Sequence, residues 1–248
     1  MLPKLVAFDL DDTLTASKAQ IAPEMAEAFA DLASRTDVCI ISGGLLVQFK
    51  KQVLDHIDLT PAQRGHLHLM PTCGTRYVRW VDGDWRELYA HSLTSEQVAA
   101  ATASIERHAK EQGVWEDNTW GEAIENRGSQ ITYSALGQQA PGEAKATWDP
   151  DGSKRARLAR AVQADVPELT VRSGGATSVD ITLAGVDKAY GMRQLMEQTG
   201  LGPGDIVFFG DRLDPDGNDF PVIATGIECR SVTDWRDTAA QVRAMLAD

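Results

Sequence analysis

The segment that most constrains the fold lies near the start of the chain, where an apolar run ends in acids. The stretch KLVAFDL is short and almost continuously apolar, which is typical of a strand buried on both faces of a parallel sheet. Three carboxylates follow closely, those of Asp9, Asp11 and Asp12. Because like charges this near to one another repel, we expect a metal ion, a lysine from elsewhere or water to offset them.

Apolar patterns of strand and helix period alternate at both ends of the chain. We expect strands in KLVAFDL, DVCIIS, HLHLM and DIVFFGD, and short ones at residues 222–224 and 227–229. We expect helices in PEMAEAFADLA, LLVQFKKQVLDHI, DKAYGMRQLMEQTG and residues 233–246. A hairpin is expected in TRYVRWVDGDWREL, with Asp82–Gly83 as its turn. This order predicts βαβ units and an open α/β sheet.

The middle of the chain has a different character. Helical patterns (EQVAAATASIERHAKEQ and SKRARLARAVQ) alternate there with strands of period two (SQITYSA and TSVDITLA), and GQQAPGEAKATWDPDGS is the most loop-like part. We therefore predict two domains, a core formed by residues 1–82 and 187–248 and an inserted α/β domain over residues 83–186.

Charge and cysteine content limit the partners and the compartment. A formal net charge of -12 argues against binding to nucleic acid. Cys39, Cys73 and Cys229 are far apart and form no CxxC pair, which favours free thiols in a reducing compartment. No apolar run approaches the roughly 18 residues of a membrane span, and acids come too early for a signal peptide. We expect a cytoplasmic protein without a membrane or nucleic-acid partner.

Reactive side chains recur at the predicted carboxyl ends of the strands, where open α/β sheets bind ligands. These side chains are Asp9 and Asp11, Ser42, Lys188, Asp211, Asn218 and Asp219. An aspartate can attack phosphorus, and Mg²⁺ can neutralise the phosphoryl charge if hard ligands such as Asp9 and Asp211 hold it. Lys188 and Ser42 can hold phosphoryl oxygens, while Asp11 can exchange a proton with the leaving group and with water.

Each of these residues also has a plainer explanation when it is taken alone. Acids at strand ends are often solvated turn formers, a serine such as Ser42 is often a helix cap, and a lysine such as Lys188 is often a surface residue. Their order along the chain, an acid pair, a hydroxyl, a lysine and a second acid pair, favours a phosphoryl-transfer site.

The segments FDLDDTLT, ISGG, VDK and FFGDRLDPDGND resemble, in order, the four motifs of the haloacid dehalogenase (HAD) superfamily. The resemblance implies a Rossmann-like α/β core with a parallel sheet and, as in subfamily IIB, a mobile α/β cap between the second and third motifs. Asp12 stands where many relatives carry glycine. The resemblance implies that Asp9 is the nucleophile and that Asp11 is the acid/base and a metal ligand through its backbone. It implies that Ser42, Gly43 and Lys188 hold the phosphate. It also implies that Asp211 is a metal ligand and that Asn218 and Asp219 support the Mg²⁺ shell.

Within the superfamily, the motifs are most similar to those of the eukaryotic-type phosphomannomutases. The segments IENRGSQITYSALGQ and RSGGATSVDITLAGVDK resemble their cap, which implies substrate binding by Arg127, Ser178 and Asp180. Asp216 replaces a glycine of their fourth motif. Three further family arginines are replaced by Lys18, Gln138 and Lys145. Lysine keeps the charge without the bidentate fork of arginine, so Lys18, Arg127 and Lys145 remain candidates for a cationic substrate-binding patch.

These replacements bear on the reaction, because a mutase must grip a second, distal phosphate while the sugar turns over. They favour a Mg²⁺-dependent phosphohydrolase that acts on a phosphorylated sugar or similar small metabolite through an aspartyl-phosphate. A phosphomannomutase-type sugar mutase is the alternative. A non-enzymatic phospho-receiver also uses acids, a hydroxyl and a lysine, but the DxD motif and the large insert argue against it. Related proteins often pair through their caps, so a homodimer is one expected state.

Overall fold

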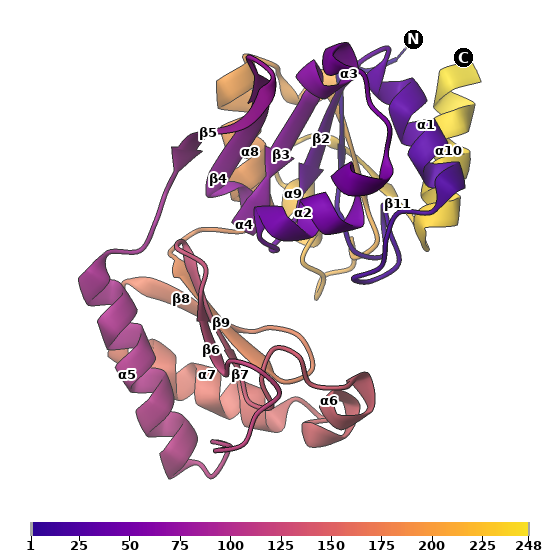
Figure 1. Ribbon diagram of the computed structural model, residues 1–248. Helices are drawn as coiled ribbons and strands as arrows, with labels where there is room; N and C mark the ends of the chain where they lie inside the picture. The colour runs from indigo at the N-terminus through magenta and orange to yellow at the C-terminus, as the bar shows by residue number, and fades with distance from the viewer. Residues whose placement is uncertain (1, 248) are drawn as a thin grey trace. The chain divides into compact units, whose positions relative to one another are not determined.

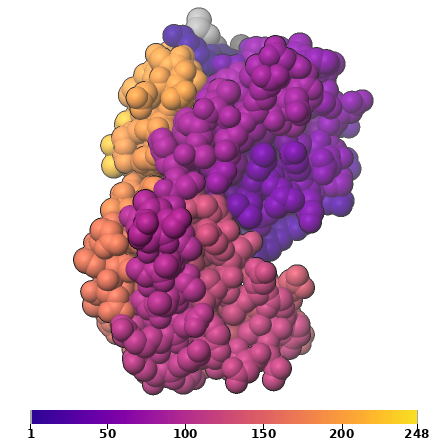
Figure 2. All heavy atoms as spheres, turned by 60° about the vertical axis from the view of Figure 1, so that its left-hand side comes forward, coloured from indigo at the N-terminus to yellow at the C-terminus, as the bar shows by residue number. Residues whose placement is uncertain are grey.

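The computed structural model describes residues 2–247 and divides the chain into two compact units. The first unit combines the residues up to Ala90 with those from Asp187 onward, and the second unit is His91–Val186 (Figure 1). In Figure 2 the atoms from the two ends of the chain, indigo to purple and orange to yellow, pack together in the first unit. The first unit is therefore built from two separated stretches of sequence, and the second is an insertion.

A seven-stranded sheet forms the centre of the first unit, in the order β11-β10-β1-β2-β3-β4-β5. The five strands from β11 to β3 are parallel, while β4 and β5 are antiparallel additions at one edge. The strands are β1 (Leu5–Phe8), β2 (Asp37–Ile41), β3 (Leu67–Met70), β4 (Arg76–Val81), β5 (Asp84–Ala90), β10 (Ile206–Gly210) and β11 (Glu228–Ser231).

Helices cover both faces of this sheet, which explains why its strands are continuously apolar. On one face Phe8 of β1 packs in a core with Phe29, and on the other face Ala7 lies in a core with Met192. The α/β class with a mainly parallel sheet is confirmed. The helices of this unit are α1 (Pro23–Ala33), α2 (Leu46–Gln52), α3 (Pro61–Gly65), α4 (Pro71–Gly74), α8 (Lys188–Thr199), α9 (Phe220–Ile223) and α10 (Trp235–Ala247), with 3-10 turns η1 (Leu54–His56) and η2 (Pro203–Asp205).

The hairpin β4–β5 lies where the sequence suggested a domain boundary. Its turn is Asp82–Gly83, and both residues have the positive φ angles, 53° and 84°, that a tight hairpin turn requires. A boundary between residues 82 and 83 would separate two strands that pair from Arg76 to Ala90. The structure instead keeps β5 in the first unit, because its partner β4 belongs to the central sheet, and the insertion begins at His91.

The second unit is a four-stranded antiparallel sheet, β6-β7-β9-β8, with helices against its apolar face. Ile131 and Ile181 of the two central strands pack there with Ile105 of α5 and Leu158 of α7. The segment that looked most loop-like in sequence contains α6. The elements are β6 (Ile124–Asn126), β7 (Gln130–Ser134), β8 (Leu169–Ser173), β9 (Ser178–Leu183), α5 (Ser95–Glu111), α6 (Gly142–Trp148) and α7 (Ser153–Asp165).

One predicted strand of the first unit is wrong. Residues 222–224, expected as a strand, belong to the end of the short helix α9 and its cap. Pro221 lies in the first helical turn, where its fixed φ is favourable, and Gly226 with φ 80° follows as the chain turns into β11. An apolar triplet alone did not carry enough periodicity to separate a strand from a helix.

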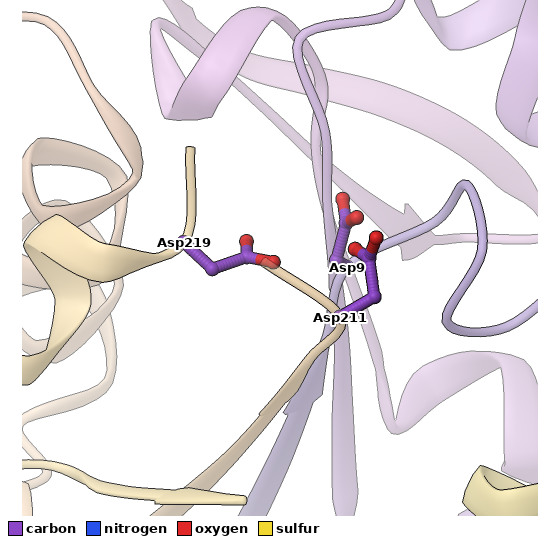
Figure 3. Close-up of side chains that lie close together, drawn as sticks. All are labelled: Asp9, Asp211 and Asp219. Atoms are coloured by element: carbon purple, nitrogen blue, oxygen red, sulfur yellow. The ribbon is translucent and has the colours of Figure 1, made fainter. Parts of the chain in front are cut away.

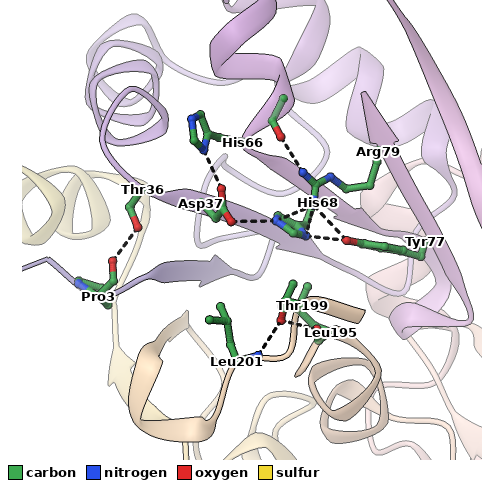
Figure 4. Close-up of polar contacts among 11 residues, drawn as sticks. Pro3, Thr36, Asp37, His66, His68, Tyr77, Arg79, Leu195, Thr199 and Leu201 are labelled. Atoms are coloured by element: carbon green, nitrogen blue, oxygen red, sulfur yellow. Dashed lines mark hydrogen bonds and ion pairs between the residues drawn. The ribbon is translucent and has the colours of Figure 1, made fainter. Parts of the chain in front are cut away.

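At the end of the sheet opposite to the acids, five polar side chains form a network, here called the histidine network (Figure 4). His68, 1% exposed, lies with Nδ1 2.7 Å from the Tyr77 hydroxyl, and Arg79 donates to this hydroxyl at 3.2 Å. Asp37 accepts from His66 at 2.7 Å and lies 3.5 Å from His68 Nε2. The two histidines, two apart in sequence, are thus joined to a carboxylate and an arginine.

Among residues 2–247, no helix has both the length and the apolar character needed to cross a membrane.

Candidate functional site

Lys188 is the centre of a buried charged group at the carboxyl ends of the parallel strands. It begins α8, is 1% exposed, and its Nζ lies 2.6 Å from Asp9 Oδ1 and 2.5 Å from Asp219 Oδ1. Asp9 directly follows β1 and is 4% exposed, while Asp219 is fully buried before α9. Residues separated by about 180 positions in sequence are therefore brought into direct contact.

Asp211 completes this group, here called the acid cluster (Asp9, Asp211 and Asp219 with Lys188). One ligand atom from each of the three aspartates lies within 4.8 Å of the others. Figure 3 shows Asp9 and Asp211 next to each other at the ends of their strands, with Asp219 directed toward them. Three hard carboxylate oxygens so placed fit a cation such as Mg²⁺, which prefers oxygen ligands. Sequence reasoning gave Asp219 a supporting role, whereas the structure brings it into direct contact with Lys188.

The charges of the acid cluster are not balanced, since three carboxylates face one ammonium. Burial raises the pKa of Asp9, and attraction to Lys188 opposes that rise. Burial also raises the pKa of Asp211, with the Asp219 charge adding to the effect. For Lys188, the two neighbouring carboxylates outweigh burial and raise the pKa, so it stays protonated. A bound divalent cation would favour the ionised form of these acids and offset the surplus negative charge.

Two glycines explain how the segment after β10 reaches the site. A Cβ placed on Gly210 would lie 2.6 Å from Asp219 Oδ2, so only glycine leaves space for this carboxylate. A Cβ on Gly217 would lie 1.9 Å from the Arg212 carbonyl oxygen. Asp219 also accepts a hydrogen bond from the backbone N–H of Arg212 at 3.1 Å. The loop can fold back tightly because these positions carry no side chain.

Asp11, the expected acid/base, is held by groups outside the acid cluster. Its Oδ1 accepts from the backbone N–H of Lys18 at 2.7 Å and from the Gln52 side chain at 3.0 Å. Gln52 is 4% exposed at the end of α2 and also donates to Thr15 Oγ1 at 3.1 Å. The exposed Lys18 has a φ of 57°, so this contact is made through an unusual backbone conformation.

Asp12 occupies a backbone position that suits glycine. Its φ is 60°, in the left-handed region where aspartate is better tolerated than most residues. Its Oδ1 accepts from the backbone N–H of Ser17 at 3.0 Å. This explains why aspartate can stand where many members of the similar family carry glycine.

Ser42 and Gly43 follow β2 on a loop that is held by hydrogen bonds from the segment after β3. Ser42 is 6% exposed, and its Oγ accepts from the backbone N–H of Gly44 at 3.1 Å. The Thr72 N–H donates to the Gly44 carbonyl and the Cys73 N–H to the Ser42 carbonyl, each at 2.9 Å. Thr72 and Cys73 have φ values of 49° and 54°, so strained backbone after β3 supports the candidate phosphate loop.

In the second unit, Asp180 lies in a polar cluster on the sheet face opposite to the apolar one. Its Oδ1 accepts from Thr132 Oγ1 at 2.7 Å and from Gln130 Nε2 at 3.0 Å, across the β7–β9 pair. Burial raises the pKa of Asp180, and the hydrogen bond from Thr132 opposes this rise. Ser178 lies two residues earlier on β9 and therefore points to the same face.

The candidate cations of the second unit are already engaged. Arg127 pairs with Glu125, with its Nε and one terminal nitrogen each 2.7 Å from the same carboxylate oxygen. Lys145 donates from Nζ to the Gln138 carbonyl oxygen at 3.1 Å, so two of the three positions that replace family arginines lie in contact. In the structure, Arg127 and Lys145 therefore each have a partner that the sequence did not indicate.

Several contributors to these sites were missed in sequence, among them Gln52, Glu125, Gln130 and Thr132. Gln52 had a detectable signal, because it lies three residues after Phe49 and so on the buried face of its helix, where a polar side chain needs a partner. Glu125 had none, since an acid two residues from Arg127 on a short strand is a common arrangement.

Comparisons with known proteins identify the family of the chain. A family model described as haloacid dehalogenase-like hydrolase matches residues 6–224. The phosphomannomutase of Schizosaccharomyces pombe is 25% identical over 257 residues, which cover 96% of this chain and 93% of that protein.

Solved structures share the fold at low sequence identity. The IMP-bound, N-terminally truncated IMP-nucleotidase of Plasmodium falciparum superposes with a TM-score of 0.68 and 12% identity, covering 100% of this chain and 69% of that chain. A haloacid dehalogenase-like hydrolase from Bacteroides thetaiotaomicron gives a TM-score of 0.66 and 15% identity, covering 98% and 99%. Because the family match spans most of its length, the chain belongs to the haloacid dehalogenase-like hydrolases.

Proposed function

We propose that this protein is a Mg²⁺-dependent phosphohydrolase that acts on a phosphorylated sugar or a similar small metabolite. The observation that carries the proposal is the acid cluster, in which three buried or half-buried carboxylates face a single lysine. Such a surplus of negative charge is costly in a folded protein unless a cation and an anionic ligand are bound there.

In the proposed reaction, an Asp9 oxygen attacks phosphorus, an O–P bond forms, and the bond from phosphorus to the ester oxygen breaks. Asp11 gives a proton to the departing oxygen, and in the second step it takes one from the water that attacks the aspartyl-phosphate. Inorganic phosphate leaves and Asp9 is regenerated. Lys188 and Ser42, with the backbone of Gly43, hold the phosphoryl oxygens.

The metal would be held by Asp9, Asp211 and the backbone carbonyl of Asp11, with Asn218 and Asp219 supporting it. When bound, Mg²⁺ supplies charge neutralisation that permits one anion to approach another. This assignment is supported by the oxygen-only donor set and by the closeness of the three carboxylates.

We further propose that the second unit recognises the part of the substrate away from the phosphate. Arg127, Ser178 and Asp180 would contact sugar hydroxyls, with Lys145 and, from the first unit, Lys18 as additional cations. The engagement of Arg127 by Glu125 and the lysines in place of arginines support a substrate with one phosphate rather than two.

A phosphosugar mutase is the second candidate, and one observation favours it. The phosphomannomutase of Schizosaccharomyces pombe aligns along 96% of this chain, which includes the whole inserted unit. Both reactions share the aspartyl-phosphate, and they differ in whether water or a second sugar hydroxyl accepts the phosphoryl group.

The deciding experiment supplies sugar 1-phosphates and 6-phosphates with Mg²⁺, in the presence and absence of a sugar 1,6-bisphosphate. Released phosphate and isomerised sugar phosphate are measured in the same reactions. We expect steady phosphate release without isomer formation. Isomer formation that depends on the bisphosphate would establish the mutase instead, and the absence of both products would remove the proposal.

A further inference from the structure

The turn between β8 and β9 directly precedes two candidate substrate residues of the second unit, Ser178 and Asp180 on β9, and an arginine side chain binds its backbone. Arg155, in the first turn of α7, donates from one terminal nitrogen to the Gly175 carbonyl at 2.5 Å and to the Gly174 carbonyl at 3.4 Å. Both carbonyls belong to the turn that connects Ser173 to Ser178. A side chain from a helix thus spans to the backbone of a separate hairpin.

The position of this turn determines where the neighbouring side chains can lie. A Cβ placed on Gly174 would lie 2.5 Å from Asp180 Oδ2 and 2.5 Å from Ser178 Oγ, so both polar atoms rest against the Gly174 backbone. The other oxygen of Asp180 is occupied by Thr132 and Gln130. Movement of the turn would therefore shift Ser178 and release one side of Asp180, because their contacts are that close.

Arg155 is itself fixed by a buried acid. Asp149, whose side chain is 1% exposed, accepts from Arg155 Nε at 2.9 Å and from the backbone N–H groups of Lys154 and Arg155 at 3.0 Å each. The guanidinium therefore has one edge on Asp149 and the other on the turn, which an ammonium cannot reproduce. Arg157, two residues later, is exposed and donates hydrogen bonds to Gln112.

We propose that Arg155, oriented by Asp149, is a positioning residue for substrate recognition. It fixes the β8–β9 turn so that Ser178 and Asp180 present their oxygens in one arrangement. The inference rests on the proposed function, since it assumes that these two residues contact the substrate. It adds a residue that touches neither substrate nor metal but determines the Michaelis constant.

The test compares Arg155→Lys and Arg155→Met with Arg157→Lys as the matched control on the same helix. Kinetics are measured with mannose 1-phosphate and with p-nitrophenyl phosphate, whose aryl group needs no sugar contacts. We expect both Arg155 variants to raise KM for mannose 1-phosphate about tenfold, with kcat nearly unchanged, because misplacement by a fraction of an ångström weakens oriented contacts. KM for p-nitrophenyl phosphate and both constants of Arg157→Lys should match the wild type.

Backbone hydrogen exchange in the full-length protein gives a readout that does not depend on activity. The amide of Gly174 donates to Ser178 at 2.8 Å and that of Ala135 to Thr177 at 3.0 Å. We expect these two amides to exchange about tenfold faster in Arg155→Lys, while the thermal midpoint stays near that of the wild type because the Asp149 ion pair is kept.

Two outcomes would contradict the proposed role of Arg155. Unchanged exchange in Arg155→Lys would show that the arginine does not hold the turn, and faster exchange with unchanged KM would show that the turn does not position substrate contacts. Either result overturns the inference. If the wild type hydrolyses neither ester, the proposed function fails, and the hold of Arg155 on the turn is still judged from exchange.

Discussion

The two ends of the central sheet carry charged networks made of similar residues, and their balance of charge differs. At the carboxyl ends of the strands, the acid cluster sets three carboxylates against Lys188. At the opposite end, the histidine network sets Asp37 against Arg79, with His66, His68 and the Tyr77 hydroxyl between them. In the histidine network the charge of Asp37 is matched by neighbouring donors, and Arg79 Nε is a buried atom without a hydrogen-bond partner among the described residues, whereas the acid cluster carries surplus negative charge.

The difference separates a structural network from a functional one. Buried polar groups that satisfy one another stabilise a fold and leave nothing for a ligand. Buried groups with surplus charge remain ready to bind a cation and, with Lys188 and the backbone, an anion. Strand β2 begins at Asp37 and is followed by Ser42, so a single strand connects the histidine network to the candidate phosphate loop. We therefore expect substitutions in the acid cluster to abolish or reduce turnover and substitutions in the histidine network to leave turnover in place.

The largest effect is expected from Asp9→Asn. The amide keeps the size of the side chain but cannot attack phosphorus, so kcat should fall on the order of 10³-fold or more. Stability should be kept or increased, because one of three repelling charges is removed. Initial rates of phosphate release and the thermal midpoint test this. The matched control is Asp37→Asn, which should retain turnover. A substantial rate of phosphate release by the Asp9→Asn variant would exclude Asp9 as the nucleophile.

The next largest effect is expected on the free energy of unfolding when Lys188 of the acid cluster is replaced. Lys188→Met leaves Asp9 and Asp219 buried without their cation, which should lower the free energy of unfolding by about 3–5 kcal/mol. Urea unfolding in EDTA measures the loss. Adding Asp219→Asn in the same chain should recover part of it, since the second charge is then gone. Equal stability of Lys188→Met and the wild type would show that the lysine does not offset these acids.

A smaller effect on activity is expected from replacing Gln52, which donates a hydrogen bond to Asp11. Gln52→Leu removes a hydrogen bond to Asp11 Oδ1 and should lower kcat about tenfold with little change in KM, because the acid/base is less well oriented. Steady-state kinetics with a good and a poor leaving group would sharpen this result, since proton donation matters most for the poor one. An equal loss of kcat with both leaving groups would contradict a role of Gln52 that acts through Asp11.

The smallest effect is a pH dependence of stability at the histidine network. Burial alone would raise the pKa of Asp37, but hydrogen bonds from His68 and His66 outweigh it and lower the pKa from 3.8 to about 2. The stabilisation is therefore present above pH 3.8 and is lost as the pH falls toward 2. Because Asp37 is partly exposed, we expect only about 1 kcal/mol. Asp37→Asn should lack this change in urea unfolding between pH 4 and 2.5, and an identical slope in both proteins would contradict the assignment.

The sequence was sufficient to predict the features that depend on local pattern. The apolar run before Asp9 indicated a buried parallel strand, and the order of acids, hydroxyl and lysine indicated strand ends that meet. The Asp82–Gly83 turn of β4–β5 was also predictable, because few residues adopt positive φ as readily as glycine. Periodicity and backbone chemistry are properties of short stretches, so one chain is enough to detect them.

Features that depend on contacts between distant stretches were not predictable. The direct contact of Lys188 with Asp219, the hydrogen bond from Gln52 to Asp11, and the hydrogen bonds from Arg155 to the β8–β9 turn join separate stretches of the chain. The helix α9 was missed for a related reason, since its apolar triplet is decided by packing. Sequence spacing carries little information about such partners.

The interruption of the first unit by the second has a consequence for how the protein is made. Strand β1 lies between β2 and β10, and residues 206–210 of β10 emerge from the ribosome only after the whole inserted unit. The inserted unit is continuous in sequence, so it can finish folding during synthesis while β1 still lacks one neighbour. Until residue 188 appears, Asp9 also has no lysine beside it. We expect pulse-labelled nascent chains to show protease protection of residues 91–186 before that of residues 5–8.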